Sequence, residues 1–297
     1  MNLIDVLVEP LGYSFIQRAL VVSVAASVVC ALLSCWLVLI GWSLMGDAVS
    51  HSVLPGVALA YLVGAPFAVG ALVFAVAAVT MIGVVRTTTK IREDAAIGVV
   101  FTTLFALGLV IISKHPSQID LGHILFGNVL GVTNADLWQV LGLGGLALAV
   151  LISKRRDLML FAFDRTQAHA LGISPARLSA LLLALLAVTI VVAIQAVGVI
   201  LVVAMLIIPG SSAYLMTERF SRMLVIAPAL GIGCAVAGVY ASYYFDASTG
   251  GIIVLAQSSV FVVAYLFGPS QGVLTSWFAA RTAIRSSAPS VSDVSAE

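Results

Sequence analysis

Long apolar stretches, separated by short polar or charged segments, recur from one end of the chain to the other. Most of them approach the roughly 20 residues that an α-helix needs to cross a bilayer. The runs are continuous and do not alternate with polar residues, which argues against a membrane β-barrel. We therefore predict an all-α, polytopic helical membrane protein with about 8–9 transmembrane helices. They are expected at residues 19–40, 44–63, 67–85, 95–113, 135–153, 179–194, 197–216, 223–244 and 251–267.

Two places in this pattern are ambiguous. The stretch 44–63 is interrupted by polar residues, a proline and two glycines, so we expect a broken helix there. The stretch 180–216 is long enough for two spans joined by a turn at 195–198, or for one long span followed by a half-helix.

Positive charges gather in four of the connecting segments. All 14 Lys and Arg residues except Arg18 and Lys114 lie at 86–92, 154–177, 219–222 and 281–285. Because cytoplasmic loops are enriched in these residues, the four segments are predicted to face the cytoplasm. The loop 114–134 then faces outward, the N-terminus is external and the C-terminus is cytoplasmic.

The composition supports the membrane class and narrows the function. With 62% hydrophobic and 9% charged residues, the chain does not resemble a soluble domain of its size. Its net charge of +1 gives no sign of nucleic-acid binding. The cysteines lie in apolar segments without metal-binding spacing and are predicted to be packing residues. Residues 1–285 are predicted to form a single transmembrane domain, and residues 286–297 a disordered cytoplasmic tail.

Asp47 is an acidic residue inside a membrane-length apolar stretch, and His51 follows one helical turn later. A carboxylate at membrane depth is costly and persists mainly where it faces a polar cavity. The i, i+4 spacing places both side chains on one helix face. A carboxylate and an imidazole together can ligate a divalent transition metal, so the pair predicts metal passage through a membrane.

Three other interpretations of this pair stay open. Asp47 and His51 could form a structural hydrogen bond between packed helices, or Asp47 could be solvated or cap a helix at the membrane interface. A proton relay is also possible, because histidine titrates near neutral pH. A transport site must release its ion, so two ligands with exchangeable waters, or two symmetry-related pairs, suit it better than a closed tetrahedral cage.

Pro55 strengthens the metal interpretation, because proline cannot donate to the carbonyl four residues back and should leave the His51 carbonyl free. Gly46 and Gly56 permit close approach or bending, and Ser43 and Ser50 could supply hydroxyl groups.

Weaker candidates lie elsewhere. His115 and His123 fall in the external loop, while Gln195 and the run 209–212 indicate helix packing more than a pathway.

A short helix is expected in the cytoplasmic segment 164–172. Asp164 is a plausible N-cap with Gln167 three residues later, and Gly172 a plausible C-terminal stop after Ala170. The segment is too short to be stable alone, so it needs a docking surface; in ATP-driven importers such a helix fits a groove on the ATPase. An ordinary loop helix explains the pattern equally well. The chain carries no P-loop, so energy for pumping would come from a partner or an ion gradient.

The chain resembles the membrane permease of bacterial ATP-binding-cassette (ABC) importers for zinc, manganese and iron. The resemblance spans about residues 9–272. It rests on the run 43–60, SLMGDAVSHSVLPGVALA, with support from 9–10, 15–20, 125–128, 170–173 and 203–212. The loop 119–132 looks more like the manganese/iron subgroup. Many relatives carry a basic residue shortly before the run 43–60, where this chain has Gly41 and Trp42.

The resemblance implies partners and residue roles. The permease would form a dimer, most simply a homodimer, with two ABC ATPase subunits docked partly on 164–172. An extracytoplasmic metal-binding protein would deliver the ion. Asp47 and His51 match the positions that bind the metal, while Asp164, Gln167, Ala170 and Gly172 match the ATPase coupling segment.

We therefore expect a permease subunit that takes up divalent metal, most simply manganese, across a bacterial inner membrane. It would have no chemical active site and no permanently bound cofactor. A gradient-coupled secondary metal transporter is the first alternative, and uptake of a siderophore or cobalamin complex is the second.

Overall fold

The computed structural model describes residues 8–114, 127, 129–270 and 272–275. Within these residues the chain forms helices and no strands. Nine helical segments there are long and apolar enough to cross a membrane. The all-α fold expected from the hydrophobic pattern is confirmed.

The elements follow one another in chain order. After the short η1 (Pro10–Gly12) come α2 (Ser14–Ile40), α3 (Ser43–Ser52), α4 (Leu54–Val63), α5 (Phe67–Thr88) and α6 (Glu93–Lys114). The second half contains η2 (Val129–Gly131), α8 (Asn134–Ser153), α9 (Arg155–Phe163), α10 (Arg165–Ala170), α11 (Pro175–Val197), α12 (Val199–Met216), α13 (Phe220–Phe245) and α14 (Thr249–Phe267). The helices α3 and α4 together make one span, Ser43–Val63.

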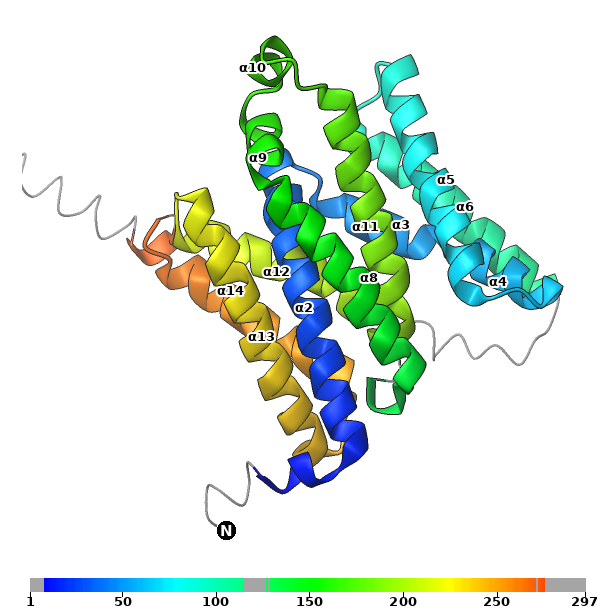
Figure 1. Cartoon of the computed structure of the whole chain (residues 1–297), viewed down its shortest axis with the longest axis vertical. Helices are drawn as coiled ribbons and strands as arrows, with labels where there is room; N and C mark the ends of the chain where they lie inside the picture. The colour runs from blue at the N-terminus through cyan, green and yellow to red at the C-terminus, as the bar shows by residue number, and fades with distance from the viewer. Residues whose placement is uncertain (1–7, 115–126, 128, 271, 276–297) are drawn as a thin grey trace, which may run out of the picture.

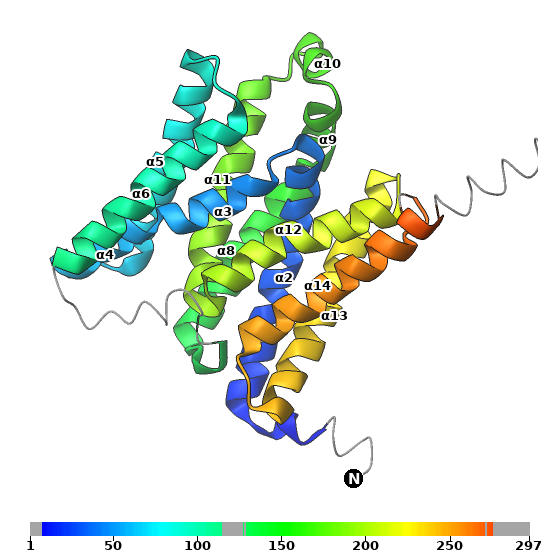
Figure 2. The same cartoon turned by 180° about the vertical axis from the view of Figure 1, so that it is seen from behind.

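Helix α2 lies in the middle of the bundle, with α8, α12 and α13 packed around it. To one side, α4, α5 and α6 pack on one another, while α13 and α14 lie on the other side (Figures 1 and 2). Helices α3 and α11 connect the two groups, since α3 contacts both α6 and α12. Apolar side chains such as Val69, Val99 and Leu255 are exposed on the outer helices, as expected for surfaces that face lipid or another subunit.

The ambiguous stretch 180–216 forms two spans. Helix α11 ends at Val197, and Gly198 separates it from α12 with a φ of +85°, a backbone conformation that favours glycine. One helix was not predicted. Between α8 and the short cytoplasmic segment lies α9, which buries Leu158 and Phe161 against the bundle.

The chain directions agree with the predicted orientation. The connection between α5 and α6 lies at the same end of the molecule as α9 and α10, whereas η1 lies at the opposite end (Figure 1). The basic residues at 86–92 and 154–177 therefore share one end, as the charge pattern predicted.

Candidate functional site

The helix that carries Asp47 and His51 is short and interrupted, as predicted. Helix α3 ends at Ser52, and α4 begins at Leu54 with Pro55 in its first turn, where a missing N–H has no cost. Val53 bridges the two helices in a helical backbone conformation. The predicted free carbonyl is wrong: the backbone oxygen of His51 accepts a hydrogen bond from the Val53 N–H.

Asp47 and His51 contact each other on one face of α3. The Nδ1 atom of His51 lies 3.2 Å from the Oδ1 atom of Asp47, and 3.0 Å from the Asp47 backbone oxygen. The His51 side chain is 25% exposed and the Asp47 side chain is 37% exposed, so the pair is half-buried and open on one side. With Nδ1 oriented by Asp47, the Nε2 atom is the ring nitrogen that can face an incoming ion.

Two phenylalanines of α6 form the apolar side of the site. The His51 ring meets Phe101 and Phe105 edge-on, with ring centroids 5.7 Å and 5.6 Å apart. These contacts place the imidazole against the apolar surface of α6. The sequence alone does not indicate these contacts, because phenylalanine in an apolar span carries no signal of a specific neighbour.

Close helix crossings hold the rest of this segment. A Cβ atom on Gly46 would lie 3.0 Å from the side chain of Leu206, so α3 runs close to α12. A Cβ atom on Gly56 would lie 2.1 Å from the backbone oxygen of Gly70, so α4 and α5 touch backbone to backbone. Both glycines therefore permit the close approach that the sequence indicated.

Two serine hydroxyls of α3 donate to backbone oxygens, and one of these, Ser50, lies 3.2 Å from the backbone oxygen of Asp47. Ser50 is buried and donates to the backbone oxygen of Gly46, and Ser52 donates to that of Ala48. Among the described residues, no group of three or more His, Cys, Asp and Glu side chains could hold a metal. In the described part of one chain, the pair is thus a two-ligand arrangement.

The second polar region, 209–212, packs against α2. Gly210 donates its N–H to the Ser34 hydroxyl at 3.2 Å, and a Cβ atom on Gly210 would clash with that hydroxyl. Ser212 is buried and donates to the Ile208 backbone oxygen. Gln195 is exposed and donates to Val191 within its own helix. The contacts of Gly210 and Ser212 agree with the packing interpretation, whereas the exposed Gln195 does not test it.

The cytoplasmic segment contains the short helix that the capping pattern predicted. The Asp164 carboxylate accepts from the backbone N–H groups of Thr166 and Gln167 at 2.8 Å and 2.9 Å. Helix α10 ends at Ala170, and Gly172 follows with a φ of +77°. Gln167 and Ala170 are exposed, so α10 presents a free surface in the single chain (Figure 1). A role in coupling stays a prediction.

Several candidates lie outside the described residues. His115, His123 and most of the loop 119–132 are among them, as is the tail 286–297.

The amino-acid sequence matches a known protein family and several of its members. Residues 12–268 match the model of the ABC 3 transport family. The chain is 50% identical over 268 residues to the manganese transport system membrane protein MntB of Synechocystis sp., covering 90% of this chain and 88% of the relative. It is 43% identical over 279 residues to the chelated iron transport system membrane protein YfeC of Yersinia pestis, covering 94% and 95%.

A solved structure shows the same architecture. The structure described as PsaBC from Streptococcus pneumoniae in complex with Fab superimposes with a TM-score of 0.82 at 35% identity. The match covers 91% of this chain and 98% of that chain.

Proposed function

The chain belongs to the ABC 3 transport family, and on that premise we propose that it is the membrane permease subunit of an ATP-driven importer for manganese or iron ions. It is a multi-pass protein of the bacterial inner membrane. The observation that carries the proposal is the Asp47–His51 pair, which lies at a helix break inside a membrane span and is open on one side.

The ligand chemistry of the pair suits a transported divalent ion. Carboxylate oxygen is a good ligand for Mn²⁺, and imidazole nitrogen for Fe²⁺ and Zn²⁺. The Asp47 carboxylate neutralises part of the ion's charge where water is scarce, and it also orients the His51 ring. One chain supplies only two ligands, so some coordination positions remain for exchangeable water even when a second copy contributes its own pair, and the ion can leave.

A second copy of the chain completes the site in this proposal. Support comes from the two-ligand arrangement, since two symmetry-related pairs would give an ion four protein ligands. The exposed side of Asp47 and His51 is consistent with a pathway between two permeases. A homodimer is the simplest assembly, because a two-fold axis brings the same pair from each copy together.

The topology is consistent with the other proposed partners. An ATPase subunit would dock on α10, whose exposed residues lie at the predicted cytoplasmic end. An extracytoplasmic binding protein would release its ion on the opposite face, near η1 and η2. ATP-driven rearrangement of the ATPases would then move α10 and open the Asp47–His51 pair toward the cytoplasm.

Reconstituted transport tests this function. The permease, its ATPase and its binding protein are placed in liposomes, and ATP-dependent uptake of Mn²⁺, Fe²⁺ and Zn²⁺ is measured one ion at a time. We expect uptake that needs ATP and a hydrolysis-competent ATPase, with Mn²⁺ or Fe²⁺ preferred. Uptake that persists without ATP and collapses with an ionophore would instead identify a gradient-coupled transporter.

A further inference from the structure

Three residues from three different segments meet just before α3, the helix that carries Asp47 and His51. Trp42 occupies the N-cap position of α3, directly after Gly41, and is only 1% exposed. The Arg86 guanidinium, from the last turn of α5, lies 5.4 Å from the centre of the Trp42 ring. The same guanidinium donates to Glu93, in the first turn of α6, at 2.5 Å.

Helix α3 needs such an anchor. It has 10 residues, too few to be stable by its own hydrogen bonds, and it is broken from α4 at Val53. Its N-terminus has no side-chain cap. Asp47 lies five residues after Trp42, so a small tilt at this end of α3 would displace the ligand pair relative to Phe101 and Phe105.

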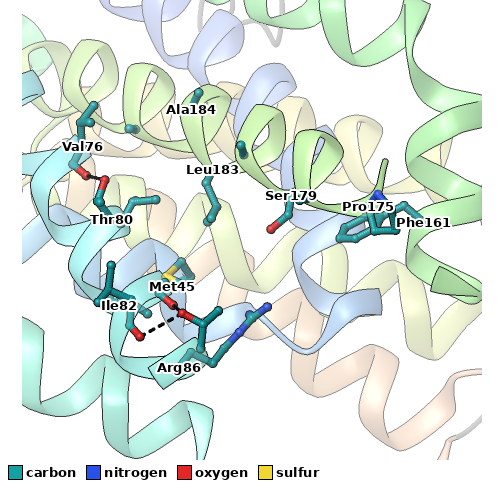
Figure 3. A pocket seen from close by; sticks show the side chains of 17 residues that line it. Met45, Val76, Thr80, Ile82, Arg86, Phe161, Pro175, Ser179, Leu183 and Ala184 are labelled. Atoms are coloured by element: carbon teal, nitrogen blue, oxygen red, sulfur yellow. Dashed lines mark hydrogen bonds between the residues drawn. The ribbon is translucent and has the colours of Figure 1, made fainter. Parts of the chain in front are cut away.

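Open space flanks the first turn of α3. A cavity of about 620 Å³ between α5 and α11 has Met45, Ile82 and Arg86 in its wall (Figure 3). A second hollow of about 350 Å³ is lined by Leu44 and Glu93. Neighbouring side chains therefore do not surround this turn completely. Polar contacts with a defined direction then contribute more to holding the position of the turn.

Arginine suits this position for a chemical reason. Its planar guanidinium can stack on an aromatic face and donate to a carboxylate at the same time, which a lysine ammonium does less well. The contact is also partly shielded from water, because the side chains of Arg86 and Glu93 are 29% and 37% exposed. The neighbouring pair Arg92–Asp94 has no such shielding, at 88% and 58% exposed.

We propose that Trp42, Arg86 and Glu93 form a positioning cluster that fixes the first turn of α3, and with it the Asp47–His51 pair, against the α5–α6 hairpin. The cluster supplies a cation, the Arg86 guanidinium, beside the first turn of α3. It does not touch the ion. This inference rests on the proposed function, because it assigns the cluster a role in ion affinity.

The test is the affinity of the complete permease–ATPase complex for Mn²⁺ alone, measured from the loss of the electron paramagnetic resonance signal of the free ion. We compare Arg86→Met, Trp42→Leu and the double variant, with Arg92→Met as the matched control. The cluster predicts a roughly 3- to 30-fold weaker affinity in each single variant. The double variant should be no weaker than the worse single variant, and Arg92→Met should bind like the native protein.

Two further measurements keep the outcome clear. Melting temperatures identify any variant that is unfolded, and Arg86→Lys, which keeps the charge, should then show an intermediate affinity. Native affinity in folded Arg86→Met, or fully additive losses in the double variant, would overturn the positioning role. Asp47→Asn is measured in parallel: if it binds Mn²⁺ normally, the proposed function itself fails, whatever the cluster variants do.

Discussion

The backbone contact between α4 and α5 gives the sharpest prediction of stability. We expect Gly56→Ala to destabilise the permease and to disturb transport. A Cβ atom at position 56 would lie 2.1 Å from the backbone oxygen of Gly70, whereas real contacts need about 3 Å or more. The two helices would have to separate by about 1 Å, because no flexible side chain can move instead.

The expected size follows from the cost of overpacking a tight interface. Such insertions cost about 1–3 kcal/mol, which corresponds to a fall in melting temperature of roughly 2–12 °C for a chain of this size. Because α4 follows directly from α3, displacement of Gly56 should also move the ligand pair and reduce metal uptake. Thermal melting of the purified protein in detergent measures the first effect, and vesicle uptake the second.

Gly83→Ala is the matched control. Gly83 lies in the same helix as Gly70, but a Cβ atom there meets nothing within 4 Å. Alanine also favours a helix over glycine by about 1 kcal/mol, so this variant should melt at the native temperature or slightly above it. If Gly56→Ala and Gly83→Ala melt alike, the close crossing of α4 and α5 is wrong.

Three further predictions concern the site and its supports. Phe101→Ala and Phe105→Ala should each weaken Mn²⁺ binding about 2- to 10-fold, because an aromatic edge contact is worth about 0.5–1.5 kcal/mol. Unchanged Mn²⁺ affinity in titrations of these variants would show that the two rings do not hold His51. Asp164→Ala removes the N-cap of α10, which is worth about 1 kcal/mol, and should lower the amount of metal taken up per ATP hydrolysed. Asp157→Ala in α9 is the control and should leave this ratio unchanged. Equal ratios in the two variants would contradict the prediction. Gly127→Ala should lower the melting temperature for two reasons: Gly127 has a φ of +67°, and a Cβ atom there would lie 2.5 Å from the Val197 backbone. An unchanged melting curve would refute that contact.

Much of the fold could be predicted because membrane spans depend on local chemistry. Each span must satisfy its backbone hydrogen bonds internally, so helix number follows from apolar length and turn residues alone. The break at Pro55 and the separation at Gly198 were predictable for the same local reason. Helix α9 was missed because its buried residues, Leu158 and Phe161, belong to a short charged segment that gains its stability from tertiary packing.

The site could be predicted only in part. The spacing of Asp47 and His51 determines that they share a helix face, and the two side chains do meet in the structure. Their surroundings come from α6, some 50 residues further along the chain, and no local pattern specifies which phenylalanines face the imidazole. The contact of Arg86 with Trp42 was hidden for the same reason, because Arg86 appeared in the sequence only as one of several basic loop residues.

The most direct test of the central claim is metal uptake by liposomes that contain the complete transporter with Asp47→Asn or His51→Ala. The control is Asp246→Asn, at the C-terminal end of α13. It removes a carboxylate far from the pair in sequence, and asparagine tolerates the left-handed backbone conformation of this position. The account predicts that both site variants assemble and hydrolyse ATP but carry Mn²⁺ and Fe²⁺ only at background rates, while the control transports normally. Native rates in either folded site variant would contradict it, and the ion would have to pass without that ligand.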